Sequence, residues 1–246
     1  LDTVSASLDC FFAYLAEPKT KPAGAVVVIQ EIFGVNHAMR ATSDWLAAMG
    51  FIAVCPDLFW RIEPRIDITD RSQAEWDKAF SLFNAFDQEK GIADLKATLA
   101  AARKLPGCNG RAGTIGFCLG GRLAFMMAAR SDSDVNVSYY GVGLEGLLGE
   151  IPAIKAPLLM HIASEDKFVP KEAQEKILAG VHGHANIRAH VYQGVDHAFA
   201  RVEGQHYDAR AATIANGRTA KIGPKGSRFM ISQSSDTSES TVGSKK

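Results

Sequence analysis

The sequence predicts an α/β fold in which a mostly parallel central sheet is flanked by helices. Short runs of aliphatic and β-branched residues alternate along the chain with amphipathic stretches of helical length, a pattern typical of a helix-covered parallel sheet. Some of these runs are apolar throughout, as expected of strands that are buried on both faces. The chain has 246 residues and is 47% hydrophobic, so it is long enough to bury such a sheet in one domain.

The first expected elements follow one another closely. Residues 25–30 (AVVVIQ) form a continuous apolar run of strand length. Residues 38–49 carry apolar side chains at helical spacing and stop before Gly50, a residue typical of the position after a helix. Residues 51–55 (FIAVC) are the next strand, which Pro56 ends because proline lacks the N–H that a strand donates.

The remaining elements continue the alternation. Residues 74–86 and 92–104 have helical spacing, and Leu-Pro-Gly at 105–107 ends the second of them. Residues 112–117 are a strand, and the helix expected at 119–130 follows it without a loop. The later expected strands are residues 135–140, 157–162 and 187–192, and the later expected helices are residues 169–179 and 204–216.

Charge and cysteine content exclude some classes of function. Lysine and arginine number 27, as do aspartate and glutamate, so we expect neither nucleic acid nor an anionic membrane surface as a partner. No apolar run approaches the roughly 18 residues of a membrane-spanning helix. The four cysteines form no C-x-x-C pair, which favours a reducing compartment and predicts a cytoplasmic protein.

Cys118 is the candidate nucleophile. It is the centre of the pattern G-x-C-x-G at residues 116–120, between an expected strand and an expected helix. This is the arrangement of a nucleophile elbow, where the glycines allow the strand and the helix to approach closely. The helix directs its positive end at the thiol, and the N–H of Leu119 points to where an oxyanion would develop. The alternative is a buried structural cysteine beside a glycine turn.

Two further residues complete a catalytic triad in the chain order of the α/β-hydrolase fold, which is nucleophile, acid, base. Asp166 follows the expected strand 157–162, and His197 follows the expected strand 187–192. Both therefore lie at the carboxyl ends of strands, where open α/β sheets place their sites. Taken singly, Asp166 could be a helix-capping carboxylate and His197 a polar loop residue, but their order and placement favour a triad with Cys118.

Glu31 and Arg201 are candidates for a buried ion pair near this site. Glu31 follows an aliphatic strand directly and would need a partner if buried, while Arg201 comes four residues after His197. Arg201 could pair with Glu31 or with an anionic substrate; the alternative is an exposed loop charge. The loop after the first strand also supplies the second oxyanion N–H of the hydrolase fold, here that of Ile32. A metal site is not expected, because His182 and His184 have no ligand-type neighbours.

In combination, several motifs resemble the dienelactone hydrolase (carboxymethylenebutenolidase) family of chloroaromatic degradation. They are QEIFG (30–34), CPDL (55–58), GFCLGG (116–121), YYGVGLE (139–145), DKFVP (166–170) and HAFAR (197–201). The resemblance implies a triad of Cys118, Asp166 and His197. It also implies that Glu31 contacts the resting thiol and helps to deprotonate it, and that Arg201 holds Glu31 and helps to bind a substrate carboxylate. Tyr140, within the fourth motif, is expected to bind substrate.

The sequence departs from the family pattern in two places. Trp76 stands where members that cleave dienelactone carry an arginine for the substrate carboxylate, and Arg71 and Arg65 are alternative sources of that cation. Trp76 is therefore expected to line the substrate site. At the other end, family members usually finish with an amphipathic helix, which residues 220–224 (AKIGP) interrupt. We expect residues 1–219 to form one α/β-hydrolase catalytic domain, and residues 220–246 to be a disordered or foreign tail.

These features predict a hydrolase that opens a small cyclic enol lactone through a cysteine nucleophile, giving a maleylacetate-like product. Its partner is a small-molecule lactone or ester, and the chemistry needs no metal or organic cofactor. One alternative is a broader carboxylesterase or thioesterase that acts on another activated acyl group. The other is a non-catalytic binding module with the hydrolase fold.

Overall fold

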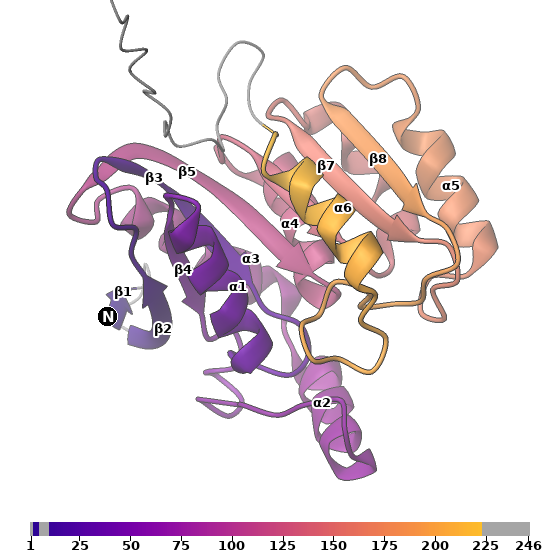
Figure 1. The fold of residues 1–246 in the computed structure, drawn as a ribbon, viewed down its shortest axis with the longest axis horizontal. Helices are drawn as coiled ribbons and strands as arrows, with labels where there is room; N and C mark the ends of the chain where they lie inside the picture. The colour runs from indigo at the N-terminus through magenta and orange to yellow at the C-terminus, as the bar shows by residue number, and fades with distance from the viewer. Residues whose placement is uncertain (1, 5–9, 223–246) are drawn as a thin grey trace, which may run out of the picture.

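A mostly parallel sheet with helices on both faces forms the centre of the protein (Figure 1). The computed structural model describes residues 2–4 and 10–222. The strands are β1 (Asp2–Val4), β2 (Cys10–Ala16), β3 (Ala23–Ile29), β4 (Ile52–Pro56), β5 (Cys108–Phe117), β6 (Asn136–Tyr139), β7 (Leu158–Ala163) and β8 (Ile187–Tyr192). The helices are α1 (His37–Ala48), α2 (Gln73–Ala85), α3 (Gln88–Ala102), α4 (Leu119–Arg130), α5 (Lys171–Val181) and α6 (Ala209–Thr219), with the 3₁₀ helices η1 (Leu144–Gly146) and η2 (Leu148–Ala153).

The strand order within the sheet is β1-β2-β4-β3-β5-β6-β7-β8. β2 is antiparallel to both β1 and β4, whereas every pair from β4 through β3 to β8 is parallel. The predicted α/β architecture with a mostly parallel sheet is confirmed. Parallel strands end at one edge, and in Figure 1 the arrowheads of β5, β7 and β8 point toward the side where α2 lies.

Two apolar cores hold the helices on the sheet. On one face, Met39 and Leu46 of α1 and Ala215 of α6 belong to a single buried cluster with side chains of the strands. On the other face, Leu95 of α3 and Phe125 of α4 belong to a second cluster, which also includes residues of α5. Figure 1 shows α1 and α6 in front of the sheet and α3 and α4 behind it. The sheet is therefore buried on both faces, which explains its apolar strands.

Capping side chains set where most helices begin. The side-chain oxygens of Asn36, Ser72, Asp87 and Asp208 accept hydrogen bonds from backbone N–H groups in the first turns of α1, α2, α3 and α6. Such caps satisfy donors that have no partner within the helix. The residue before α4 is Cys118, whose side chain makes no capping hydrogen bond.

The C-terminal helix differs from the expected one. We expected a helix at residues 204–216, but α6 spans Ala209–Thr219 because Asp208 caps its first turn. It continues past Asn216 because the Thr219 hydroxyl is buried, 2.7 Å from the Tyr139 hydroxyl and 3.0 Å from His161 Nε2. Of the expected tail, Ile222 packs against the α1–α6 core, and residues 223–246 lie outside the described residues.

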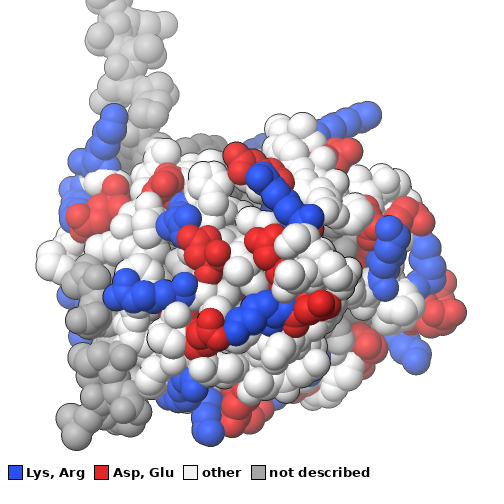
Figure 2. Space-filling model, turned by 90° about the horizontal axis from the view of Figure 1, so that it is seen from below, with Lys and Arg blue, Asp and Glu red and all other residues white. Residues whose placement is uncertain are grey.

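Charges of both signs are interspersed on the surface. Figure 2 views the molecule from below Figure 1, and lysine and arginine side chains alternate there with aspartate and glutamate. Within the part of the chain that the structure describes, no helix is long and apolar enough to cross a membrane.

Candidate active site

Cys118 lies on the sharp turn between β5 and α4. Its backbone has φ 54° and ψ −115°, a conformation that residues other than glycine rarely adopt. The turn is fixed by a hydrogen bond from the Cys118 N–H to the Tyr139 carbonyl at 3.1 Å. Two other residues of the site, Tyr140 and Ala198, also have positive φ angles, of 37° and 62°. Backbone strain is thus concentrated at the site, as in many active sites.

The glycines on either side of Cys118 are required by close backbone contacts. A Cβ atom at Gly116 would lie 1.9 Å from the Gly120 carbonyl oxygen, and one at Gly120 would lie 2.2 Å from the Ile29 carbonyl oxygen. Neither position can therefore accept a larger residue without moving the backbone. The G-x-C-x-G pattern thus brings α4 against β3 and β5, with the thiol between them.

His197 and Asp166 form a buried pair. His197 Nδ1 lies 2.9 Å from Asp166 Oδ2 and 3.0 Å from Oδ1, and Oδ1 also accepts hydrogen bonds from the backbone N–H groups of Phe168 and Val169. His197 Nε2 is buried and makes no hydrogen bond in the described structure. The pair leaves this second ring nitrogen available to a reacting group.

The charge state of His197 depends on its neighbours. Burial disfavours the imidazolium, but negative charge on Cys118 and the hydrogen bond with Asp166 outweigh burial and raise the pKa of His197 to about 10. Cys118 and His197 line the same pocket. Cys118, His197 and Asp166, predicted from chain order, are therefore brought together.

Neighbouring residues of similar chemistry point elsewhere. Glu165, next to Asp166 in the sequence, pairs with Lys171 at 3.1 Å, and Asp196 pairs with Lys167 at 2.8 Å. Cys55 is buried under α1, and burial strongly raises the pKa of its thiol. Of these acids and thiols, only Asp166 and Cys118 are placed to act with His197.

Glu31 and Arg201 form the buried ion pair that the sequence suggested. Arg201 Nε donates to Glu31 Oε2 at 2.5 Å, and Arg201 Nη2 donates to Glu31 Oε1 at 3.2 Å. Burial opposes the positive charge, but Glu31 outweighs it and raises the pKa of Arg201. A contact of Glu31 with the Cys118 thiol was expected from family resemblance, yet no hydrogen bond joins them among the described residues, and both carboxylate oxygens accept from Arg201.

Asp70 is a third member of this cluster, and no pattern in the sequence indicated it. Arg201 Nη1 donates to Asp70 Oδ2 at 2.6 Å, and the backbone N–H of Gln205 donates to the same oxygen at 3.1 Å. Asp70 lies 131 positions from Arg201 in the chain, and no motif or spacing connects the two. The Arg201 guanidinium therefore lies between two buried carboxylates.

The two predicted oxyanion residues, Leu119 and Ile32, lie beside Cys118. Leu119 is the first residue of α4, and the N–H groups of a first helical turn have no partner within the helix. Ile32 lies in the loop after β3 and lines the same pocket as Cys118. Both positions were predicted from the hydrolase pattern, and both adjoin the thiol.

A pocket of about 230 Å³ opens beside Cys118, His197 and Arg201. Its apolar wall includes the five aromatic residues Phe33, Trp76, Phe80, Phe83 and Phe168. The Trp76 ring stacks on Phe80 at 5.5 Å and on Phe168 at 6.3 Å, and Phe168 contacts the His197 ring edge-on at 4.9 Å. The sequence singled out only Trp76 of this wall. Phe80 and Phe83 lie on α2 with Trp76, one and two helical turns further along, whereas Phe33 and Phe168 come from two separate loops.

Tyr140, expected to bind substrate, is not one of the residues that line the pocket. It is buried behind the site, with its ring 5.0 Å from that of His197, and its hydroxyl has no hydrogen-bond partner in the described structure. Burial, together with the charge of Glu31, raises the pKa of this hydroxyl well above its usual value. Tyr140 therefore supports the triad from the protein side rather than forming the pocket wall.

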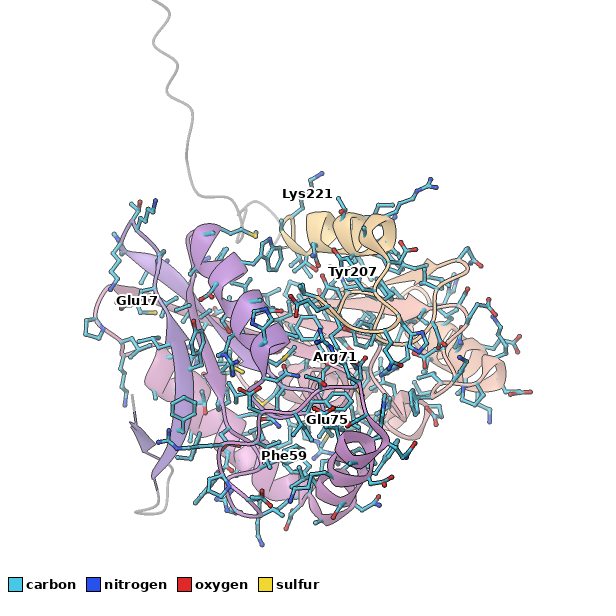
Figure 3. All side chains as sticks on the ribbon, turned by 60° about the horizontal axis from the view of Figure 1, so that its bottom comes forward. Glu17, Phe59, Arg71, Glu75, Tyr207 and Lys221 are labelled. Carbon is cyan, nitrogen blue, oxygen red and sulfur yellow. The ribbon has the colours of Figure 1, made fainter. Side chains whose placement is uncertain are left out.

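The alternative cations proposed for a substrate carboxylate are also outside the pocket. Arg71 lies on the segment leading into α2 (Figure 3), is exposed, and pairs with Glu203 at 3.6 Å. The Arg65 guanidinium lies over the Phe12 ring. His182 is exposed in the turn after α5, and no group of three or more potential ligands (His, Cys, Asp or Glu) in the described residues could hold a metal ion.

Known proteins are similar to this sequence over most of its length. Residues 11–222 match the dienelactone hydrolase family. A putative carboxymethylenebutenolidase of Azospirillum brasilense is 57% identical over 85% of this chain and 91% of its own length. Carboxymethylenebutenolidase 1 of Cupriavidus pinatubonensis is 42% identical over 86% of this chain and 90% of its own.

A solved structure agrees with these relatives. A putative dienelactone hydrolase from Klebsiella pneumoniae superposes with a TM-score of 0.78 at 26% identity, covering 89% of this chain and 94% of the other. The described fold, the extent of the family match and the identity with the relatives all point to the same family. The chain therefore belongs to the dienelactone hydrolase family, and it is a carboxylic ester hydrolase with the α/β-hydrolase fold.

Proposed function

We propose that this hydrolase opens a small cyclic enol lactone through a covalent thioester on Cys118. The observation that carries the proposal is the convergence of three groups on one pocket. The thiol lies on the strand-to-helix turn, the imidazole of His197 is held by Asp166, and Cys118 and His197 both line the cavity. In a chain of this family, this arrangement supports acyl transfer to sulfur.

The first half of the proposed reaction forms the acyl-enzyme. His197 Nε2 holds the proton of the Cys118 thiol, and the sulfur, as the thiolate, attacks the lactone carbonyl to give a tetrahedral oxyanion. The N–H groups of Leu119 and Ile32 stabilise this oxyanion. The intermediate then collapses as the ring C–O bond breaks, and the ring oxygen leaves as an enolate. The buried Asp166 keeps the imidazole oriented and favours its protonated form.

The second half returns the enzyme to its resting state. A water molecule attacks the thioester carbonyl while one of its protons passes to the enolate, or to His197 once His197 has given its own proton to the enolate. The carbon–sulfur bond breaks, the carboxylic acid is released, and the thiol recovers its proton. Lactone and water are thereby converted into one open-chain acid, whose enol can rearrange to the ketone. For a dienelactone the product is maleylacetate or a close analogue.

Glu31 is assigned a supporting role in the first step. Its carboxylate is held by Arg201 behind the pocket, and Arg201 lines the pocket itself. A substrate oxygen, such as that of a lactone or ester carbonyl, that accepts a hydrogen bond from Arg201 would loosen the pair and free Glu31 to act on the thiol. Glu31 and Arg201 thus couple substrate binding to activation of the Cys118 thiol.

The test combines two substrates with two cysteine variants. We expect the parent enzyme to hydrolyse a cyclic enol lactone with higher kcat/KM than a chromogenic acetate ester. Cys118→Ala should lower both rates by several orders of magnitude, as loss of a nucleophile does in triad enzymes. Cys108→Ser is the control, because Cys108 begins β5, the strand that ends just before Cys118, and lines no part of this pocket.

The outcomes separate the three functional hypotheses. Ester turnover without lactone turnover would instead support the broader carboxylesterase or thioesterase. Absence of both activities in a folded parent protein would support the non-catalytic binding module. Residual activity of Cys118→Ala above a tenth of the parent, on the order expected if the nucleophile is elsewhere, would remove Cys118 from the mechanism.

A further inference from the structure

The positive charge nearest the pocket is already shared between two carboxylates. Arg201 donates to Glu31 from Nε and Nη2, and to Asp70 from Nη1. The Arg201, Glu31 and Asp70 side chains are only 6%, 1% and 4% exposed. Water therefore screens these charges weakly. One guanidinium is the ion-pair partner of both carboxylates.

This arrangement works against a substrate that offers a carboxylate. Arg201 is the only lysine or arginine among the described residues that line the pocket. A substrate carboxylate bound at Arg201 would have to displace Glu31 or Asp70, or would lie beside both. Either case leaves like charges close together in a buried site, which costs free energy.

The rest of the pocket offers apolar surface instead. Trp76 stands in the wall and is fixed there by a hydrogen bond from its Nε1 to the Asp70 carbonyl at 3.0 Å. Its ring is stacked with those of Phe80 and Phe168, at interplanar angles of 27° and 23°. Phe80, Phe83 and Phe168 are 40%, 37% and 47% exposed, so the aromatic wall continues from the pocket to the surface.

We propose that Asp70 determines specificity at this site, by placing a second carboxylate on Arg201 besides Glu31, so that the pocket selects a neutral enol lactone or ester carrying a flat apolar group. Such a group stacks on Trp76 and Phe168 while the acyl carbonyl lies at Cys118. Substrates that would place a carboxylate at Arg201 are disfavoured. The inference rests on the proposed function, because it concerns the substrate class of the same site.

Two pairs of substrates, each differing only in charge, test the inference. One pair is a carboxymethylene butenolide and its neutral methyl ester. The other is a 4-nitrophenyl ester of a short alkanoic acid and the 4-nitrophenyl ester of the chain that ends in a free carboxylate. The measured quantity is the ratio of kcat/KM, neutral over acidic, at low ionic strength. We expect the ratio to exceed one for the parent enzyme in both pairs.

Two substitutions should lower this ratio. Asp70→Asn keeps the shape and one acceptor oxygen but removes a negative charge from Arg201, and should shift the ratio toward the acidic substrate by about tenfold, as expected for one charge-assisted contact. Trp76→Arg supplies a new cation in the wall and should act in the same direction. Asp67→Asn is the control, since Asp67 lies on the same loop, is half exposed, and pairs with Arg40 away from the pocket.

Each outcome either supports or overturns the inference. A parent ratio below one, or an unchanged ratio in folded Asp70→Asn and Trp76→Arg enzymes, would overturn it. Should one variant fail to fold, the parent ratio and the other variant still decide. If both lactones are inert but the neutral nitrophenyl ester is preferred, the proposed lactone activity fails and the specificity stands. Turnover of neither pair would overturn both.

Discussion

His197 and His161 are two buried histidines whose partners give them different roles. His197 pairs with Asp166 and keeps Nε2 free beside the pocket. His161 has both ring nitrogens engaged, Nδ1 with the Tyr192 hydroxyl at 2.8 Å and Nε2 with the Thr219 hydroxyl at 3.0 Å. A histidine with both nitrogens occupied by structural hydrogen bonds cannot serve as a base without breaking one of them. The hydrogen bonds therefore identify His197 as the catalytic candidate and His161 as a residue that holds the end of α6.

We predict that His197→Gln lowers kcat by several orders of magnitude and that Asp166→Asn lowers it less, because Asp166 orients the base and does not react. His161→Gln is the matched control, as a second buried histidine. It should retain most of the activity when assayed well below its melting temperature. The check is kcat for all four proteins on one ester. A severe loss in His161→Gln together with a mild one in His197→Gln would contradict the assignment.

Single residues differed in how far the sequence could identify them. Cys118 was identifiable because its local requirements, the glycines at 116 and 120, are written within five positions. Asp166 and His197 were identifiable because parallel strands place their carboxyl ends together. Asp70 was not, because its role comes from a contact with Arg201, 131 positions away, which only the folded chain creates.

At the scale of elements, α2 supports much of the apolar wall of the pocket. It carries Trp76, Phe80 and Phe83. Its first turn is held by the Ser72 cap, in which the hydroxyl oxygen accepts from the Glu75 N–H and the hydroxyl donates to Glu75 Oε2 at 2.8 Å. In Figure 3 Glu75 lies close to Arg71, where the chain enters this helix.

Removing this cap should therefore affect substrate binding more than chemistry. Ser72→Ala should destabilise α2 by about 1 kcal/mol, a typical value for losing a serine cap. Because Trp76 lies in the second turn, we predict a raised KM for an apolar ester with kcat nearly unchanged. Ser81→Ala, an exposed serine within the same helix, is the control and should leave both constants unchanged. A fall in kcat at constant KM would contradict a role of α2 in binding alone.

Elements with strong periodicity were predicted better than those that depend on distant contacts. Each expected strand and helix is present, with ends shifted by a few residues. Strand β2 (CFFAYLA), which lies between the edge strand β1 and β4, was missed although it is apolar, because its antiparallel pairing with both neighbours is set by the fold. The start of α6 was misplaced because the Asp208 cap, and not Gly204, begins the helix.

For the whole molecule, the two buried histidines titrate in opposite senses. Burial lowers the pKa of His161 well below 6.5, and the nearby charges of His190 and Arg218 act in the same direction. In this pH range the unfolded chain binds a proton at His161 that the folded protein does not bind. The free energy of unfolding therefore falls as the pH drops from about 6.5 toward the pKa of His161 in the folded protein. For His197, Cys118 and Asp166 outweigh burial and raise the pKa to about 10. Its stabilising contribution is complete below about 6.5 and is lost as pH rises toward 10.

The last prediction follows from these two signs. His161→Gln should lose less stability than the parent between pH 7 and pH 5, because it has no buried imidazole to protonate. His197→Gln should lose less than the parent between pH 7 and pH 10, because it lacks the proton that the parent releases in that range. Urea unfolding midpoints at about half-unit pH steps would measure both differences, and groups that titrate alike in all three proteins cancel when variants are compared with the parent. Parallel curves for parent and His197→Gln above pH 7 would mean that His197 is neutral in the resting enzyme. The route through Arg201 and Glu31 would then have to activate the Cys118 nucleophile when substrate binds.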